Sequence, residues 1–246
     1  MNHTKLESYV VSHSLELTVV SITNFIVVIA YAIAASRLLC RSRCLTSAWW
    51  WAISGTLIAA SSLVAGVNHG YFQFRIPEVS LILYFITAIL IGLTATGIYF
   101  TVFLHFLARS QIRTTLNILA VLVLIVYTGF ILLDKSLINT ENQLAYWPMI
   151  IDYCIPLLLF FIFNLCFIRS KGSVHFIMFF LFIIVGSVIQ QLPIQALNGL
   201  ISSDMLYHII GAFSAIFFFC TGKALLKKSQ IDRHNLSTNH STKDAC

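Results

Sequence analysis

The sequence predicts an all-α integral membrane protein, a bundle of seven transmembrane helices with the N-terminus outside and the C-terminus in the cytoplasm. Seven long apolar stretches lie between residues 17 and 224, and basic residues gather in alternate gaps between them. Composition agrees, since hydrophobic residues make up 59% of the chain and charged residues 10%, with a mean hydropathy of +0.89. We therefore expect a multi-pass protein resident in a membrane.

The apolar stretches have lengths close to the 20 or so residues with which a helix crosses the hydrocarbon core. The predicted spans are 17–38, 47–69, 79–106, 115–133, 148–168, 174–196 and 205–224. The third span is long enough to tilt or protrude. Residues 1–16 are predicted to form a short outer segment without the apolar run of a cleavable signal. Residues 225–246 form a polar Ser/Thr/Asn-rich tail for which we expect disorder.

Orientation follows from the basic residues, because loops rich in Lys and Arg stay in the cytoplasm. Lys5, Arg75 and Lys135 fall on the predicted outer side. The other twelve of the fifteen lie on the opposite side: Arg37, Arg41, Arg43, Arg109, Arg113, Arg169, Lys171, Lys223, Lys227, Lys228, Arg233 and Lys243. The sequence pI near 9.1 is thereby explained by topology, and no nucleic-acid partner is predicted.

Two further patterns lie on the second span. Trp49–Trp51 stand near its inner end and predict an aromatic anchor at the membrane interface. Gly55, Ala59, Ser62 and Gly66 recur at three- and four-residue spacing, which is typical of a helix face that packs closely against a neighbour.

Ionisable side chains inside membrane helices are costly, so each of them is a candidate for a functional site. His69 closes the second span, and Asp204 and His208 open the seventh, all at the outer end. Asp204 and His208 are four residues apart and share one helix face. A catalytic Zn²⁺ has about three protein ligands and a fourth position left to water. If the second and seventh helices adjoin, these three side chains could supply the protein ligands.

Three more residues complete this hypothesis. Glu78 or Asp152 would act as the base on the metal-bound water, and Ser62 would steady a ligand or an oxyanion. A structural interpretation stays open beside it. Glu78, Asp152 and Asp204 all lie in first helical turns, where acidic side chains are favoured by capping and by the helix dipole.

This arrangement resembles the CREST superfamily of seven-helix membrane proteins, which includes alkaline ceramidases, PAQR receptors and remodellers of glycolipid anchors. The resemblance implies a zinc-dependent hydrolase of membrane lipids, with His69 and His208 as metal ligands and Glu78 as the acid of the third helix. The sequence departs from the family pattern in three places. Ala65 stands where the family has Ser, Asp204 replaces a His, and the acid is Glu in place of Asp.

A non-catalytic function is the alternative. The sequence fits a seven-helix sensor or receptor, although it lacks the Asp/Glu-Arg-Tyr and Asn-Pro-x-x-Tyr motifs, and Lys223 lies at the inner end of the seventh span, where it cannot hold a retinal. It also fits a small-molecule carrier, for which Gln190, Gln191 and Gln195 would line a polar vestibule at the outer end of the sixth span.

Overall fold

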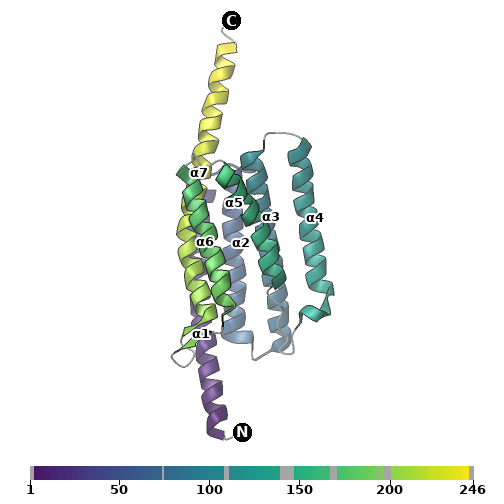
Figure 1. The fold of residues 1–246 in the computed structure, drawn as a ribbon, viewed down its shortest axis with the longest axis vertical. Helices are drawn as coiled ribbons and strands as arrows, with labels where there is room; N and C mark the ends of the chain where they lie inside the picture. Colours follow the sequence, from purple (N-terminus) through teal and green to yellow (C-terminus); the bar gives the residue numbers. More distant parts are fainter. Residues whose placement is uncertain are drawn as a thin grey trace.

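The protein is a bundle of long, roughly parallel and antiparallel helices, described here from a computed structural model (Figure 1). The structure describes residues 3–73, 75–107, 111–138, 147–166, 171–192, 194–196 and 201–243. The long helices are α1 (His3–Leu39), α2 (Ser47–Val67), α3 (Pro77–Phe106), α4 (Gln111–Leu133), α5 (Trp147–Cys166), α6 (Lys171–Gln190) and α7 (Ser203–Lys243).

Shorter elements lie in the connections. A π-helical turn, η1 (Asn68–Phe72), prolongs α2, and a 3₁₀ turn, η2 (Lys135–Leu137), follows α4. Between α6 and α7, β1 (Gln195–Ala196) pairs antiparallel with β2 (Ile201–Ser202), with Gln195 opposite Ser202.

Within the described residues, seven helical segments are long and apolar enough to cross a membrane, which confirms the predicted fold class. They are Leu15–Leu39, Ser47–Phe72, Pro77–Phe106, Gln111–Leu133, Trp147–Leu165, Ser173–Gln190 and Ser203–Lys227. The protein is thus an integral multi-pass membrane protein. α1 begins at His3 and α7 continues to Lys243, so the tail for which disorder is predicted is helical as far as Lys243. The boundaries of the outer segment and of the tail stay predictions.

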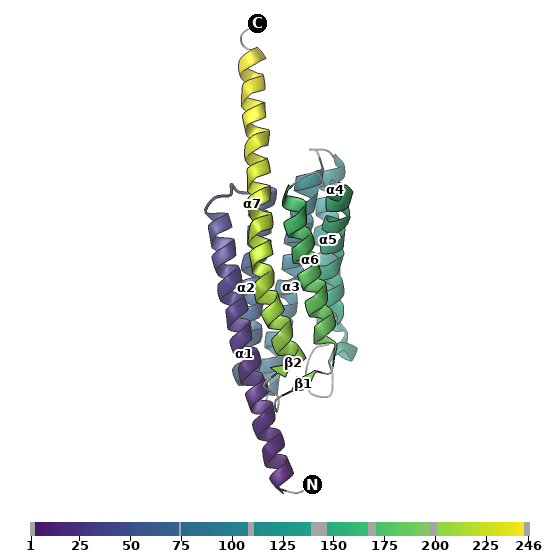
Figure 2. The same ribbon diagram turned by 60° about the vertical axis from the view of Figure 1, so that its left-hand side comes forward.

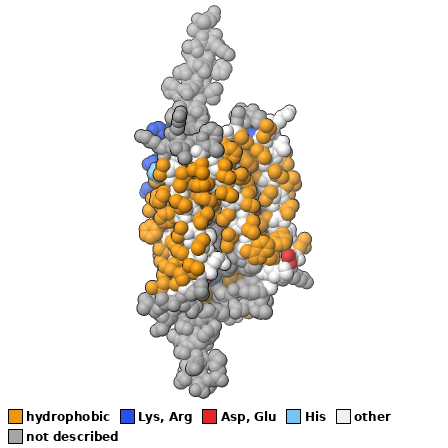
Figure 3. Space-filling view, in the orientation of Figure 1, with side chains coloured by type: hydrophobic (Ala, Val, Ile, Leu, Met, Phe, Trp, Pro, Cys, Tyr) orange, Lys and Arg blue, Asp and Glu red, His pale blue; other side chains and the backbone are white. Residues whose placement is uncertain are grey.

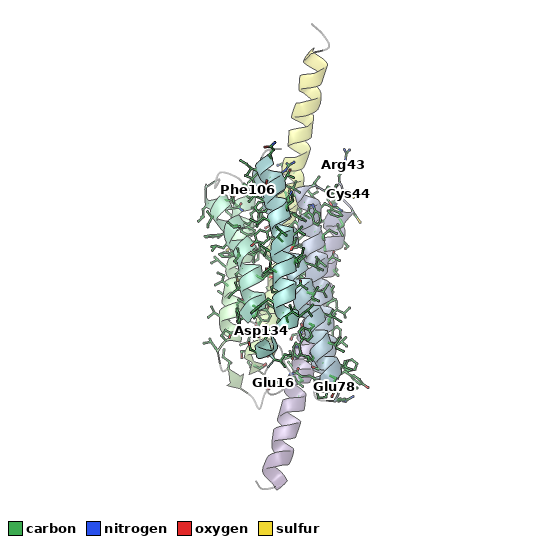
Figure 4. All side chains as sticks on the ribbon, turned by 90° about the vertical axis from the view of Figure 1, so that its right-hand side faces the viewer. Glu16, Arg43, Cys44, Glu78, Phe106 and Asp134 are labelled. Carbon is green, nitrogen blue, oxygen red and sulfur yellow. The ribbon has the colours of Figure 1, made fainter. Side chains whose placement is uncertain are left out.

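The two ends of the bundle differ in charge. We call the end that carries the N-terminus the N-side and the opposite end the C-side (Figure 1). Arg43 and Cys44 lie at the C-side, whereas Glu16, Glu78 and Asp134 lie at the N-side (Figure 4). Between the ends, the face drawn in Figure 3 is mostly apolar, and exposed apolar side chains of the bundle include Val126 and Ile29. Such a surface suits contact with lipid; the N-out orientation remains a prediction.

Helix packing forms a ring with one helix outside it. Going round the ring, α1 packs against α2, α2 against α3, and α3 against α5. From α5 the ring passes to α6 and then to α7, which packs against α1 and closes it. Figure 2 shows α7 between α1 and α6. α4 packs mainly on α3, at the edge of the bundle (Figure 1). α2 also contacts α7, so the second and seventh helices adjoin, as the metal hypothesis requires.

The core of the C-side half is built around Trp51. Its ring stacks on Phe218 of α7, with centroids 4.6 Å apart and planes at 16°. Its indole N–H donates a hydrogen bond of 2.9 Å to the backbone carbonyl of Phe218. Phe160, Phe176 and Phe179 meet the indole edge to face. Trp51 is fully buried, so the predicted interfacial anchor does not describe this residue: its N–H has a partner inside the bundle.

Two glycines let the helices come this close. A methyl group at Gly55 would lie 2.6 Å from the ring of Phe218, and one at Gly222 would lie 2.4 Å from Leu38 and 3.0 Å from Trp51. Gly55 belongs to the predicted small-residue face of α2, which therefore packs against α1 and α7.

Replacing Trp51 by Ala should destabilise the bundle by about 3 kcal/mol or more, because it removes a fully buried aromatic side chain and leaves a cavity. Reversible unfolding in mixed detergent micelles measures the loss. Trp49→Ala is the matched control, since Trp49 is only half-buried and should cost much less. Equal losses for the two variants would contradict a central role for Trp51.

Candidate functional site

The N-side half of the bundle contains a cavity that is partly open to the exterior. Side chains from α1, α2, α3, α5, α6 and α7 line it, and the centre of a water molecule can reach about 160 Å³ of its interior. By that measure the cavity has room for on the order of ten water molecules or a ligand with about as many non-hydrogen atoms. It runs from Asp204 and Gln190 at the N-side to Tyr31 and Thr94 near mid-bundle.

Asp204 lies at the N-side rim of this cavity. α7 begins at Ser203 because the hydroxyl of Ser202 caps it, accepting a hydrogen bond of 3.3 Å from the backbone N–H of Met205. Asp204 thus falls in the first turn, where the helix dipole favours a negative charge. Gln190 Nε2 donates to Asp204 Oδ1 at 3.2 Å, which ties the end of α6 to the start of α7.

His208 lies one turn deeper and contacts α1. Asn24 Nδ2 is 3.0 Å from His208 Nε2 and also donates to the carbonyl of Val20 at 3.0 Å. The Val20 contact fixes the amide orientation, because the reversed amide would place two acceptor oxygens together. His208 Nε2 is therefore the acceptor, and the imidazole carries its proton on Nδ1.

Asn24 leaves one polar atom without a partner. The residue is 1% exposed, and its Oδ1 accepts no hydrogen bond from the described part of the chain. A buried carbonyl oxygen without a donor costs about 1–3 kcal/mol. Because Asn24 lines the cavity, a bound water or ligand is the natural donor.

His69 reaches the cavity from the π-helical turn at the end of α2. Its Nδ1 lies 2.5 Å from Gln73 Oε1, an acceptor, so Nδ1 carries a proton and Nε2 is left as an acceptor when the ring is neutral. The ring also meets Tyr84 edge to face. Single π turns are frequent at functional sites, because they shift side chains relative to the regular helix.

Four of the predicted site residues line this one cavity: Ser62, His69, Asp204 and His208. His69 interacts electrostatically with both Asp204 and His208. His69, Asp204 and His208 do not form a metal site in this structure. Within the described residues, no group of three His, Cys, Asp or Glu side chains is placed to hold a metal ion.

The two candidate bases lie elsewhere. Glu78 is exposed at the N-side end of α3 and is not part of the cavity lining (Figure 4). Asp152 is buried on α5 but does not line the cavity either; it interacts electrostatically with Tyr99 of α3 and Tyr127 of α4. In the described geometry neither carboxylate faces the histidines across the cavity.

Sequence reasoning missed Asn24, which joins α1 to α7 through His208. A signal for it existed, since an Asn inside an otherwise apolar span marks a side chain that needs a partner within the bundle. It also missed Tyr153 and Tyr207, which line the cavity beside the polar residues. Tyrosines are too common in membrane spans to stand out in one sequence.

Together, the apolar exterior and the internal polar cavity define a seven-helix membrane protein with a site inside the bundle. Residues 19–227 match the family described as "Family of unknown function (DUF6962)", and the chain belongs to that family. No curated protein matches the chain, and no solved structure does.

A double-mutant cycle between Asn24→Leu and His208→Leu should give a coupling energy between about 0.5 and 2 kcal/mol, the range of hydrogen bonds between membrane helices. Unfolding in mixed micelles supplies the four stabilities. A matched cycle of Asn24→Leu with Phe213→Leu, an exposed position on α7, should show no coupling. Additive effects of Asn24 and His208 would contradict the hydrogen bond.

Proposed function

We propose that this protein binds a small, partly apolar molecule in the N-side cavity, as a sensor or a carrier. The observation that carries the proposal is a cavity within the bundle whose lining is polar at one end and mostly apolar along its walls. Few such cavities occur per protein, and most ligand sites combine apolar walls with a few well-placed polar groups.

Three hydroxyls of the cavity wall are already engaged, which suits a binding role. Ser61, Thr87 and Thr94 each donate to a backbone carbonyl of their own helix, to Ile58, Leu83 and Leu90 respectively. Their protons are engaged, so each offers only acceptor lone pairs to a guest. None of these three hydroxyls has a base beside it that would make it a nucleophile.

Cys154 gives a direct test, because it lines the cavity. In protein whose other five cysteines are Ser, reconstituted in nanodiscs, the uncharged reagent 2-hydroxyethyl methanethiosulfonate should modify Cys154 from the aqueous side. The matched control keeps only Cys220, which is also partly buried but lies outside the cavity lining. Mass spectrometry of the intact protein follows the two rates.

We expect Cys154 to react at least tenfold faster than Cys220. Ala65→Phe, which fills the cavity, should lower the rate of Cys154 modification. Leu63→Phe, at an exposed position on the same helix, should leave the rate unchanged. If Cys154 reacts no faster than Cys220, the cavity admits no solute and the proposal fails.

A zinc-dependent hydrolase of membrane lipids, as the CREST resemblance implies, is the second candidate. The presence of Ser62, His69, Asp204 and His208 around one cavity favours it. Metal binding would require a rearrangement. The Nε2 lone pair of His208 accepts from Asn24, so the amide must turn away before this nitrogen can bind a metal.

Elemental mass spectrometry of the purified protein decides between the two candidates. A metalloenzyme should hold about one zinc per chain and lose it in His208→Ala, whereas Glu78→Ala should keep it, because Glu78 lies outside the cavity lining. Protein without zinc after dialysis against micromolar Zn²⁺ would exclude the metal hypothesis.

A further inference from the structure

The described lining of the N-side cavity has an unbalanced charge. Asp204 is its only Asp or Glu, and it contains no Lys or Arg. No described cation pairs with Asp204, whose hydrogen bond comes from the neutral amide of Gln190. A neutral amide satisfies one lone pair of the carboxylate but leaves its charge in place.

Neither the helix terminus nor the two histidines of the lining remove this imbalance. His69 donates from Nδ1 to the neutral amide of Gln73, so this contact is satisfied by a neutral ring, and no ion pair between His69 and Asp204 occurs among the described residues. The N-terminus of α7 contributes roughly half a positive charge at most. His208 accepts a hydrogen bond at Nε2 and is therefore uncharged in this arrangement. A negative potential remains at the N-side of the cavity, and charged groups within a membrane bundle are normally paired or face a functional pathway.

From this we infer that the ligand of the cavity is a small organic cation, a protonated amine whose ammonium group pairs with Asp204. The inference rests on the proposed binding function and names the chemical class of the ligand.

A second, independent atom calls for a hydrogen-bond donor on the ligand. Asn24 Oδ1 is buried, belongs to a cavity-lining residue and has no partner among the described residues. Asn24 contacts His208, which lies one turn below Asp204 on the same face of α7. A primary or secondary ammonium carries enough protons to serve both a carboxylate and this carbonyl, which an anion or an ether cannot do.

The surrounding rings suit the same ligand. Tyr207 packs against His208 with ring centroids 5.0 Å apart, and Tyr153 of α5 lines the same cavity. Electron-rich ring faces attract a desolvated cation. Deeper in the cavity, Val27, Ile58 and Ile91 offer an apolar floor for a hydrocarbon or aryl group.

The experiment compares two probes of equal size, 2-phenylethylamine and the uncharged 2-phenylethanol. Each is titrated against the single-Cys154 protein, and the slowing of Cys154 modification reports occupancy. We expect the amine to protect with at least tenfold higher affinity than the alcohol. Asp204→Asn should abolish this preference, because Asn keeps an acceptor for Gln190 and loses the charge.

Glu78→Gln is the matched control. It removes an exposed carboxylate at the same end of the bundle, outside the cavity, and should leave the preference for the amine intact. Protection of Asp204→Asn by 2-phenylethanol, as in wild type, shows that the variant keeps a folded cavity.

The outcomes separate the two proposals. If Cys154 is unreactive, the proposed binding function itself is wrong. If Cys154 is reactive but both probes protect it equally, or neither does, the cavity is open and the proposal of a protonated amine as ligand is wrong. A preference for the amine that survives in Asp204→Asn also overturns the assignment, because the charge then acts from elsewhere.

Discussion

Trp51 joins α2 to α5, α6 and α7 at one point, and the position of the N-side cavity depends on this contact. The indole stacks on Phe218, donates to its carbonyl and is surrounded by rings from α5 and α6. In a bilayer no hydrophobic force drives helices together, since lipid tails are as apolar as side chains. Close packing and a few hydrogen bonds must supply the cohesion. Gly55 and Gly222 bring the backbones near enough for both.

The two halves of the bundle therefore have different properties. At the C-side, large aromatic side chains fill the space between α2, α5, α6 and α7. Toward the N-side, α1, α2 with its π-helical turn, α3, α6 and α7 contribute Ser, Thr, Asn and His side chains, and these line a cavity. Tyr31 marks the transition, because it packs against Phe218 and bonds to Ser214 of α7 at 2.6 Å while lining the cavity floor. The densely packed C-side half thus supports an N-side half that has room for a ligand.

Polar groups at the N-side also hold the structure together. Asn24 links α1 to His208, Ser21 donates to the carbonyl of Gly66 at 2.7 Å, and Gln190 holds Asp204. Capping explains why Asp204 stands in the first turn of α7, yet it does not explain why the carboxylate faces a cavity. Asp152 presents the opposite case. It is buried on α5, outside the cavity, with one oxygen unpartnered among the described residues.

The sequence alone determined the membrane class, the number of spans and the charge difference between the ends, because helix length and hydropathy are local properties that the bilayer reads directly. It also placed Ser62, His69, Asp204 and His208 at one end of the bundle, and these line one cavity. Tertiary structure decided the rest. Whether Trp51 faces lipid or core, whether Glu78 and Asp152 reach the histidines, and which atom of Asn24 is left unpaired depend on helix rotation and on which helices adjoin. Those are set by packing between residues far apart in the chain, and no local pattern encodes them.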